Sequence, residues 1–136
     1  MVIPAKVNNA SYGVIILFLL IHFNVYNTYS QFSLAPNGVT IVCPGASPGD
    51  TGVVDGVTYT AVDYNLLNSK LNAGEDLSLC CTTPVTSLNR LFEKEYSFND
   101  DISNWDTSNV TDMERTFQQA YNFNQDISNW DTSNVT

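Results

Sequence analysis

Apolar side chains recur at matching places along the second half of the chain, in stretches that are nearly copies of one another. The string DISNWDTSNVT occurs at 101–111 and again at 126–136. The longer segments 98–111 and 123–136 differ only where Asp100 is replaced by Gln125. The same register extends further back with fewer matches. A fixed period of roughly 20–30 residues is typical of a solenoid, in which like units stack along one axis.

The register predicts three units, of which the first is degenerate and the last is shortened. They span residues 73–97, 98–122 and 123–136. A single unit cannot bury its own aromatic and aliphatic side chains, whereas stacked units bury each of them against its own copy. Because the last unit would leave Ile127 and Trp130 poorly covered, we expect the sequence to be a fragment of a longer array.

Within a unit, the pattern changes from the period of a strand to that of a helix. Residues 102–105 form a short β-favouring stretch between two aspartates, and residues 106–109 favour a turn. Thr111 and Glu114 fit a capping box, after which apolar residues follow at helical spacing. We therefore expect one short strand and one short helix in each unit, and the helix of the second unit runs from Met113 to Ala120 or Tyr121.

Residues 31–72 do not repeat, and we expect them to form a small β-rich cap that covers the first unit. Residues 37–45 read as a strand, and residues 52–62 read as a hairpin that turns at Asp55-Gly56. A helix over residues 64–71 follows, with an aspartate before it and a glycine after it.

The N-terminal segment, residues 1–30, reads as a secretory signal. Lys6 is its only charge, an apolar run follows over residues 14–21, and small residues precede Gln31. The apolar run is shorter than the roughly 20 residues of a membrane-spanning helix. We therefore expect cleavage after Ser30, no membrane span in the mature chain, and a secreted or cell-surface protein.

Composition excludes several kinds of function. Acidic residues outnumber basic ones by 14 to 5, which disfavours nucleic acid as a partner because phosphate binding needs clustered Lys and Arg. The only histidine, His22, lies in the signal. The mature chain therefore lacks the base of a Ser-His-Asp or Cys-His site and the usual His ligand of zinc. We expect no enzymatic activity, no metal and no cofactor.

Three cysteines, Cys43, Cys80 and Cys81, occur in this chain that we expect to be exported. One disulfide and one free thiol is the simplest account. We favour the pairing of Cys43 with Cys81, and Cys43 with Cys80 is the alternative. A ring between the two adjacent cysteines would be strained.

The string FNQDISNWDTSNVT, with DMERTF after its other copy, closely resembles the repeat of BspA-like leucine-rich-repeat surface proteins. The matching positions are Phe98, Asn99, Asp101, Ile102, Ser103, Trp105, Asp106, Ser108, Val110, Thr111, Asp112, Met113, Phe117 and Ala120. The resemblance implies an exported bacterial surface protein with an α/β repeat solenoid of the irregular leucine-rich-repeat class. It also implies attachment to host proteins, to other cells or within biofilms.

The lead-in, residues 37–63, also looks like that of such proteins in Bacteroidetes-type bacteria. Cys43 and Cys81 fall where that lead-in tends to have its cysteines. The additional Cys80 departs from the family pattern, so the resemblance leaves the disulfide pairing open.

Repeated residues that suggest chemistry also have structural explanations. Trp105 and Trp130 could form an exposed row that grips sugar or peptide, but we expect them to pack in the core. Asp101, Asp106 and Asp112 could begin a calcium-binding column, but capping and turn formation explain aspartates at these places. A catalytic carboxylate pair should be unique and lie in a pocket, whereas these carboxylates recur in every unit.

The leading hypothesis is a non-enzymatic adhesion or binding module whose partner is an extracellular protein or glycan. The candidate binding face consists of polar residues in the strand region: Ser103, Asn104, Asp106, Ser128, Asn129 and Asp131. Repeated polar side chains there would give many weak, additive contacts. The alternatives are an architectural spacer or matrix protein without a ligand, and the non-catalytic part of a larger secreted hydrolase.

Overall fold

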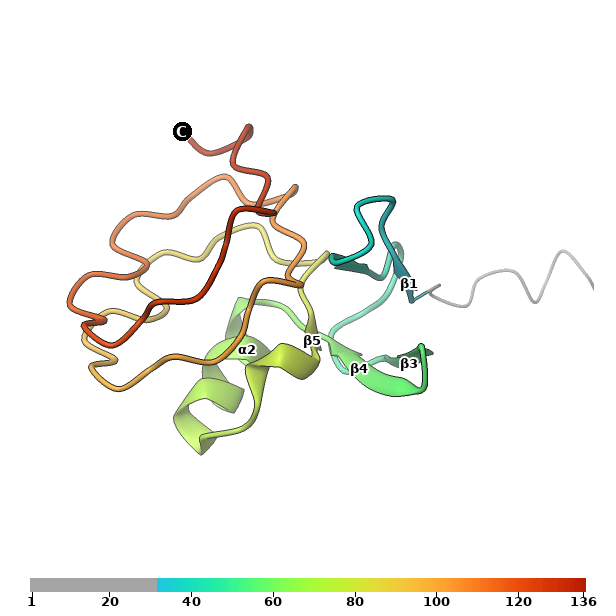
Figure 1. The fold of residues 1–136 in the computed structure, drawn as a ribbon, viewed down its shortest axis with the longest axis horizontal. Coiled ribbons are helices and arrows are strands. Elements are labelled where there is room, and N and C mark those ends of the chain that lie inside the picture. The colour runs from blue at the N-terminus through green and yellow to red at the C-terminus, as the bar shows by residue number, and fades with distance from the viewer. Residues whose placement is uncertain (1–31) are drawn as a thin grey trace, which may run out of the picture.

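The structure is a computed structural model that describes residues 32–136 of the 136-residue chain (Figure 1). The predicted signal, residues 1–30, lies outside the described residues. The helices and strands are, in chain order, β1 (Ser33–Leu34), β2 (Ile41–Val42), β3 (Thr51–Val54), β4 (Val57–Ala61), α2 (Tyr64–Ala73), the 3-10 helix η1 (Leu77–Leu79) and β5 (Cys80–Cys81). No helix in this part of the chain is long and apolar enough to cross a membrane.

Strands β1 and β2 form a small antiparallel sheet, with Ser33 opposite Val42. The predicted strand over residues 37–45 is too long, because its first residues form the turn between β1 and β2. The side-chain oxygen of Asn37 accepts hydrogen bonds from the N–H groups of Val39 and Thr40, which commits Asn37 to that turn.

The predicted hairpin is confirmed, with β3 and β4 antiparallel and a turn at Asp55-Gly56. Both turn residues have positive φ, 50° and 82°, as a two-residue hairpin loop requires. Strand β4 also pairs in parallel with β5, where Thr60 lies opposite Cys80. This pairing joins the non-repeating segment to the chain that follows it.

The predicted helix is confirmed as α2, which extends to Ala73 and so ends slightly later than expected. Asp63 caps its start by accepting a hydrogen bond from the N–H of Leu66, and Gly74 ends it with a φ of 67°. Leu67 is fully buried, whereas Leu66 and Leu71 are half-buried against the same core. The helix thereby covers the apolar side of the first predicted unit.

The rest of the chain winds in irregular coils that lie on one another beside α2 (Figure 1). We call residues 73–97 the first coil, 98–122 the second coil and 123–136 the third coil. Alternate N–H groups of the first coil donate to carbonyl oxygens at the equivalent part of the second coil. The pairs are Leu88 to Asp112, Arg90 to Glu114, Phe92 to Thr116 and Lys94 to Gln118, at 2.8–3.0 Å. The intervening N–H groups, at Leu91, Glu93 and Glu95, donate instead to the carbonyl three residues back.

This hydrogen bonding shows that the prediction of a helix over residues 113–120 is wrong. Arg115 and Gln119 have φ values of 56° and 65°, and their counterparts Arg90 and Lys94 have φ values of 57° and 65°. Residues with positive φ interrupt an α-helix. The N–H groups of Thr116, Gln118 and Ala120 bond three residues back, so the segment is a series of turns. The apolar residues at helical spacing point inward because of these turns.

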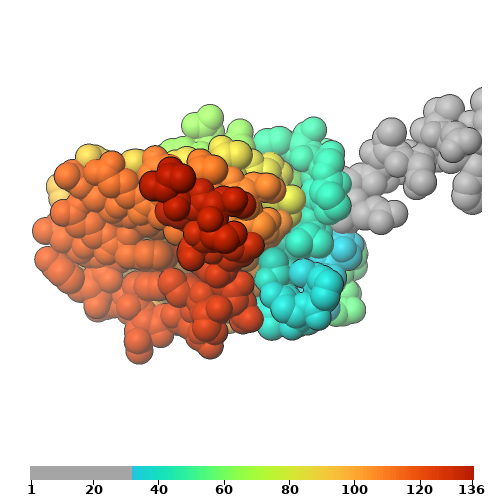
Figure 2. Space-filling view, turned by 90° about the horizontal axis from the view of Figure 1, so that it is seen from above, coloured from blue at the N-terminus to red at the C-terminus, as the bar shows by residue number. Residues whose placement is uncertain are grey.

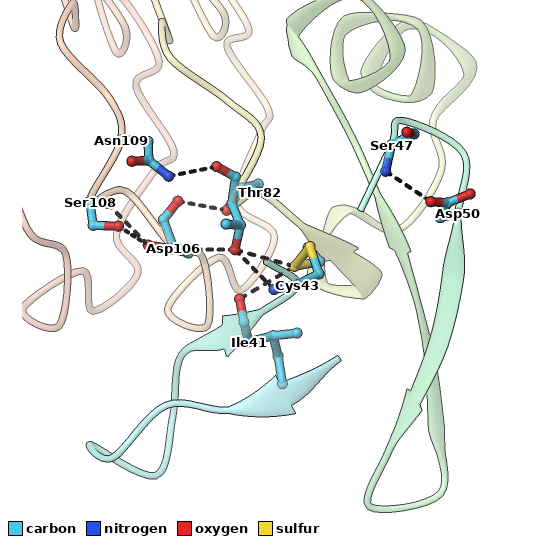
Figure 3. The surroundings of a disulfide bond; sticks show 10 residues. Ile41, Cys43, Ser47, Asp50, Thr82, Asp106, Ser108 and Asn109 are labelled. Carbon is cyan, nitrogen blue, oxygen red and sulfur yellow. Dashed lines mark hydrogen bonds between the residues drawn. A yellow bond between two sulfur atoms is a disulfide. The ribbon is translucent and has the colours of Figure 1, made fainter. Parts of the chain in front are cut away.

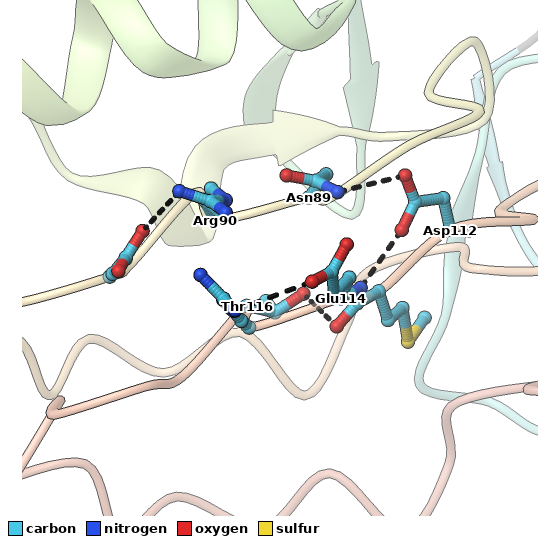
Figure 4. A network of polar contacts seen from close by, with 8 residues as sticks. Asn89, Arg90, Asp112, Glu114 and Thr116 are labelled. Carbon is cyan, nitrogen blue, oxygen red and sulfur yellow. Dashed lines mark hydrogen bonds and ion pairs between the residues drawn. The ribbon is translucent and has the colours of Figure 1, made fainter.

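The predicted strand over residues 102–105 and the predicted capping box are also absent. The N–H of Trp105 donates to the carbonyl of Ile102, which closes a turn. The N–H of Glu114 donates to the carboxylate of Asp112, and the hydroxyl of Thr111 donates to the carbonyl of Thr86 on the first coil. Turn-forming side chains compete successfully with regular structure in each coil. Figure 4 shows Asp112 between Glu114 and Asn89, whose side-chain amide donates to it at 3.0 Å.

Equivalent aromatic rings of neighbouring coils stack on one another. The ring centroids are 6.0 Å apart for Trp105 and Trp130, with planes 4° apart, and 5.3 Å apart for Phe92 and Phe117. The contact that we expected between copies is therefore present. The indole N–H of Trp105 donates to the carbonyl of Leu77, and Trp130 repeats this bond one coil later. Aromatic packing and hydrogen bonding thus act at the same positions in successive coils.

A disulfide joins Cys43, just after β2, to Cys81 in β5 (Figure 3). Cys80 is a free thiol that is 1% exposed, and its burial raises its pKa to about 11. Beside the disulfide, the hydroxyl of Thr83 accepts from the N–H of Cys43 and donates to the carboxylate of Asp106. The disulfide and this short chain of hydrogen bonds tie the N-terminal segment to the second coil.

We expect the disulfide to contribute much of the stability. The cysteines are 38 residues apart, and closing such a loop is worth about 4 kcal/mol in the chain-entropy estimate. The Cys43→Ala, Cys81→Ala double variant should therefore lower the midpoint of thermal unfolding by more than about 10 °C. Cys80→Ala is the control, because it removes a buried thiol and keeps the disulfide. An equal loss in the control would show that packing, and not the loop, dominates.

A second prediction concerns the residues with positive φ. A β-branched side chain is strained at the φ of 56° found for Arg115, so Arg115→Val should reduce the free energy of unfolding by about 1–2 kcal/mol. Arg115→Gly should change it by less than about 1 kcal/mol, because glycine adopts this backbone freely but gains entropy when unfolded. The Arg115 side chain is exposed and pairs only with its exposed neighbour Glu114, so its removal costs little in either variant. Urea unfolding that ranks the two variants equally would contradict the turn geometry.

Candidate binding surface

The six residues of the predicted binding face differ in exposure between the second and third coils. In the second coil, Asn104 donates from its side chain to the carbonyl of Ser78 at 2.7 Å, and its own carbonyl accepts from the N–H of Ile41. Ser103 is half-buried and donates its N–H to Asp101. Asn104 therefore holds the first coil and β2 together, and little of it is free for a ligand.

Asp106 is also engaged within the protein and is only 7% exposed. One carboxylate oxygen accepts from the hydroxyl of Thr83 at 2.6 Å, and the other accepts from both the N–H and the hydroxyl of Ser108 (Figure 3). Hydrogen bonds to a charged group are stronger than neutral ones, so this carboxylate braces its own turn against Thr83 of the first coil.

In the third coil, the copies Ser128, Asn129 and Asp131 are exposed. The hydroxyl and the N–H of Ser133 donate to Asp131 and hold the pKa of its carboxyl below the usual value. The N–H of Ser128 does the same for the pKa of Asp126. Both carboxylates are therefore negative at neutral pH and face solvent.

Part of the predicted face borders a hollow of about 250 Å³, which we call the polar hollow because most of its lining residues are of polar type. It lies between the turn that joins β1 to β2 and the facing parts of the second and third coils, and Figure 2 shows that hairpin, in cyan, beside the last coil, in dark red. Its lining residues are Ala35, Asn37, Thr40, Val42, Trp105, Asp106, Thr107, Ser108, Asn129 and Asp131. The structure thus brings Asp106, Asn129 and Asp131 to one hollow, while Ser103, Asn104 and Ser128 lie outside its lining.

Sequence reasoning missed the contribution of the N-terminal segment to this hollow. Asn37 and Thr40 line it, and each is hydrogen-bonded to the other through its side chain at 2.9 Å. The turn-forming residues Asn37-Gly38 signal a loop, but nothing in the sequence signals that this loop lies beside residues near the other end of the chain. The hollow has two carboxylates and no basic residue in its lining, so it suits a ligand rich in hydrogen-bond donors or positive groups.

We predicted that the tryptophans pack in the core instead of forming an exposed row. Trp105, which is 1% exposed, agrees with this prediction. The exposed aromatic pair is instead Tyr96 and Tyr121, at 54% and 73%, with ring centroids 5.6 Å apart. One face of each ring is turned towards the other tyrosine, and the rest of both side chains remains largely exposed. Tyr121 was considered only as an alternative to Ala120 on the apolar face of the predicted helix, so its exposure was not predicted.

The aspartates considered for a calcium column lie at turns. Within residues 32–136, no group of three or more His, Cys, Asp or Glu side chains is close enough together to hold a metal ion. Hydrogen bonds from the hydroxyl and N–H of Ser103 hold the pKa of Asp101 below its usual value, and the N–H of Glu114, followed by Asn89, does so for Asp112. Each carboxylate thus satisfies backbone N–H groups of its own turn.

Comparison with known families assigns the repeated part of the chain. Residues 63–136, more than half of the 136 residues, match a family described as Mycoplasma protein of unknown function, DUF285. The chain belongs to this family. The match begins at Asp63, so helix α2 and all three coils lie within it. No curated protein and no solved structure matches the chain.

We expect the two copies of one aspartate to differ in their effect on stability. Asp106→Ala should lower the free energy of unfolding by about 1–3 kcal/mol, because the Thr83 hydroxyl loses its acceptor beside the disulfide. Asp131→Ala removes the exposed copy, which accepts only from Ser133, and should cost about 0.5 kcal/mol. Equal losses in chemical denaturation would contradict the bracing role of Asp106.

Proposed function

We propose that this protein is a secreted or cell-surface repeat protein that acts as a non-enzymatic binding module. In this proposal the coils belong to an irregular leucine-rich-repeat solenoid of the BspA-like type. Support comes from the hydrogen bonds and ring stacking between equivalent residues of neighbouring coils, together with the resemblance of their sequence to that repeat. The family description names Mycoplasma and states no activity, so it leaves both the BspA-like assignment and a Bacteroidetes-type origin as proposals.

Export is supported by the chemistry of the cysteines. A disulfide between Cys43 and Cys81 persists in oxidising surroundings and is uncommon in the reducing cytosol. The remaining thiol, Cys80, is buried, and its raised pKa keeps it protonated and unreactive. These features fit a protein that works outside the cell.

The observation that carries the binding role is the polar hollow between the β1–β2 turn and the coils. Asn129 and Asp131 on the third coil face solvent there, opposite Asn37 of the turn. Amide and carboxylate groups from two separate segments can hydrogen-bond one ligand from both sides. The lining chemistry favours an extracellular protein segment or a glycan, both of which offer many N–H or O–H donors.

Two alternatives remain in view. An architectural spacer without a ligand is favoured by the engagement of Asn104 and Asp106 within the protein, because those residues serve the stack itself. The non-catalytic part of a larger secreted hydrolase is the third possibility, and no observation among the described residues favours it specifically.

A binding assay separates these possibilities. Protein secreted by cells that express the full chain would be immobilised and titrated with extracellular matrix proteins and with soluble glycans. We expect saturable binding to at least one of them. Asp131→Asn should weaken it about tenfold, equivalent to about 1.4 kcal/mol, because it removes the exposed charge in the hollow.

Asp126→Asn is the matched control. Asp126 lies on the same coil, is exposed, and accepts from a serine N–H two residues on in the same way, but it does not line the hollow. The affinity of the Asp126→Asn variant for the bound probe should match that of the unaltered protein. Absence of saturable binding to every probe would support the spacer instead, and equal effects of both variants would exclude the hollow as the site.

A further inference from the structure

One column of aromatic rings lies at the exposed edge of the coils instead of in the core. Tyr96 of the first coil and Tyr121 of the second coil occupy equivalent positions, with ring centroids 5.6 Å apart and ring planes 23° apart. Tyr96 is 54% exposed although Tyr121 lies against one of its faces. The phenol groups of this column therefore point sideways from the stack, where a reagent in solution reaches them.

Hydrogen bonds between successive windings of the chain hold the two tyrosines at this spacing. Shortly before them, the N–H of Lys94 donates to the carbonyl of Gln118 at 2.9 Å. Shortly after them, the side-chain oxygen of Asn99 accepts from the N–H of Asn124 at 2.8 Å. Each ring thus has the other as a fixed neighbour, and the effective concentration of one phenol at the other greatly exceeds that between molecules in dilute solution.

The other tyrosines of the described residues lack such a partner. Tyr59 and Tyr64 are both half-buried, and the hydroxyl of Tyr64 donates to the carbonyl of Asn89 at 3.0 Å. Within residues 32–136, the rings that stack at the other repeated positions belong to phenylalanines and tryptophans. Tyr96 and Tyr121 therefore form the one tyrosine–tyrosine stack in this part of the chain.

We propose that Tyr96 and Tyr121 form a modification site, at which a peroxidase with hydrogen peroxide joins the two rings through a carbon–carbon bond. The bond fastens the first coil to the second coil at their exposed edge. Neither tyrosine lines the polar hollow, so the inference does not depend on what that hollow binds.

The reaction balances with hydrogen peroxide as the oxidant. Each phenol loses one electron and one proton and becomes a phenoxyl radical, whose unpaired electron is shared with the ring carbons beside the oxygen. One such carbon of Tyr96 bonds to one of Tyr121. The hydrogen on each bonded carbon then leaves as a proton, and each oxygen regains a proton. In all, the pair loses two electrons and two protons, which convert one molecule of hydrogen peroxide to two of water.

The test treats dilute protein, secreted from the full chain, with a peroxidase and limiting hydrogen peroxide. We expect a monomeric product that has dityrosine fluorescence and a mass lower by two hydrogens. Protease digestion and mass spectrometry should find the peptide that contains Tyr96 joined to the peptide that contains Tyr121. Because the new bond closes a loop of one full repeat, it should raise the midpoint of thermal unfolding by at least about 5 °C.

Conservative variants locate the bond. Tyr96→Phe and Tyr121→Phe each keep a ring in the stack and remove one phenol hydroxyl, so the yield of cross-linked monomer should fall at least tenfold in either variant. Tyr59→Phe is the matched control, because it removes a phenol hydroxyl from β4, away from the stack. The yield in this control should equal that of the unaltered protein. Peroxidase treatment of Tyr121→Phe should leave its unfolding midpoint unchanged.

Three results would overturn the proposal. One is absence of the bond between Tyr96 and Tyr121 in a solution where the same enzyme couples added free tyrosine. Another is cross-linking only between molecules, seen as dimers whose yield falls on dilution. The third is an unchanged unfolding midpoint in the cross-linked monomer, which would show that the bond does not fasten the coils. None of these results bears on the ligand titration of the polar hollow, so the two proposals fail separately.

Discussion

The fold depends on one constraint, which is that backbone N–H groups in an irregular buried chain must find acceptors. The coils meet it by alternation, since every second N–H from Leu88 to Lys94 reaches the neighbouring coil. Of the N–H groups between them, those of Leu91 and Glu93 reach back three residues, and that of Asn89 donates to the hydroxyl of Ser87. This alternation constrains the register between coils. A coil longer or shorter by one residue would exchange the two sets of N–H groups and would move the inward side chains, such as Phe92, towards solvent.

The aromatic core follows from the same register. Because the backbone bonds hold equivalent residues directly over one another, Phe92 meets Phe117 and Trp105 meets Trp130. The neighbouring coils contribute to the burial of each layer, and Phe92, which also packs on Phe98, is fully buried whereas Phe117 is half-buried. On the opposite side, α2 packs its leucines against this core. The disulfide-linked strands enclose a separate apolar cluster.

The sequence alone predicted the features that depend on local turn and cap residues or on the identity of the repeated segments. The Asp55-Gly56 turn, the Asp63 cap and the meeting of equivalent tryptophans all follow from the residues present. The helix over residues 113–120 was wrong because a series of turns places apolar residues inward at the same spacing as a helix. The series of turns depends on positive φ at Arg115 and Gln119. Neither residue type indicates positive φ in a sequence, whereas glycine or asparagine would. The polar hollow was not predictable either, because it joins Asn37 to residues far along the chain.

The identical strings at 101–111 and 126–136 show why local sequence does not assign a role within a repeat. Asp106 and Asp131 have the same neighbours in sequence, and each accepts from a serine N–H two residues on. Asp106 is buried and bonded to Thr83, which in turn bonds Cys43, whereas Asp131 is exposed in the hollow. The neighbouring coil thus decides whether a repeated residue supports the stack or is available to a ligand. For a chain built in this way, binding residues are found by comparing the surroundings of equivalent positions, and those whose counterparts are engaged while they are open are the ones to test.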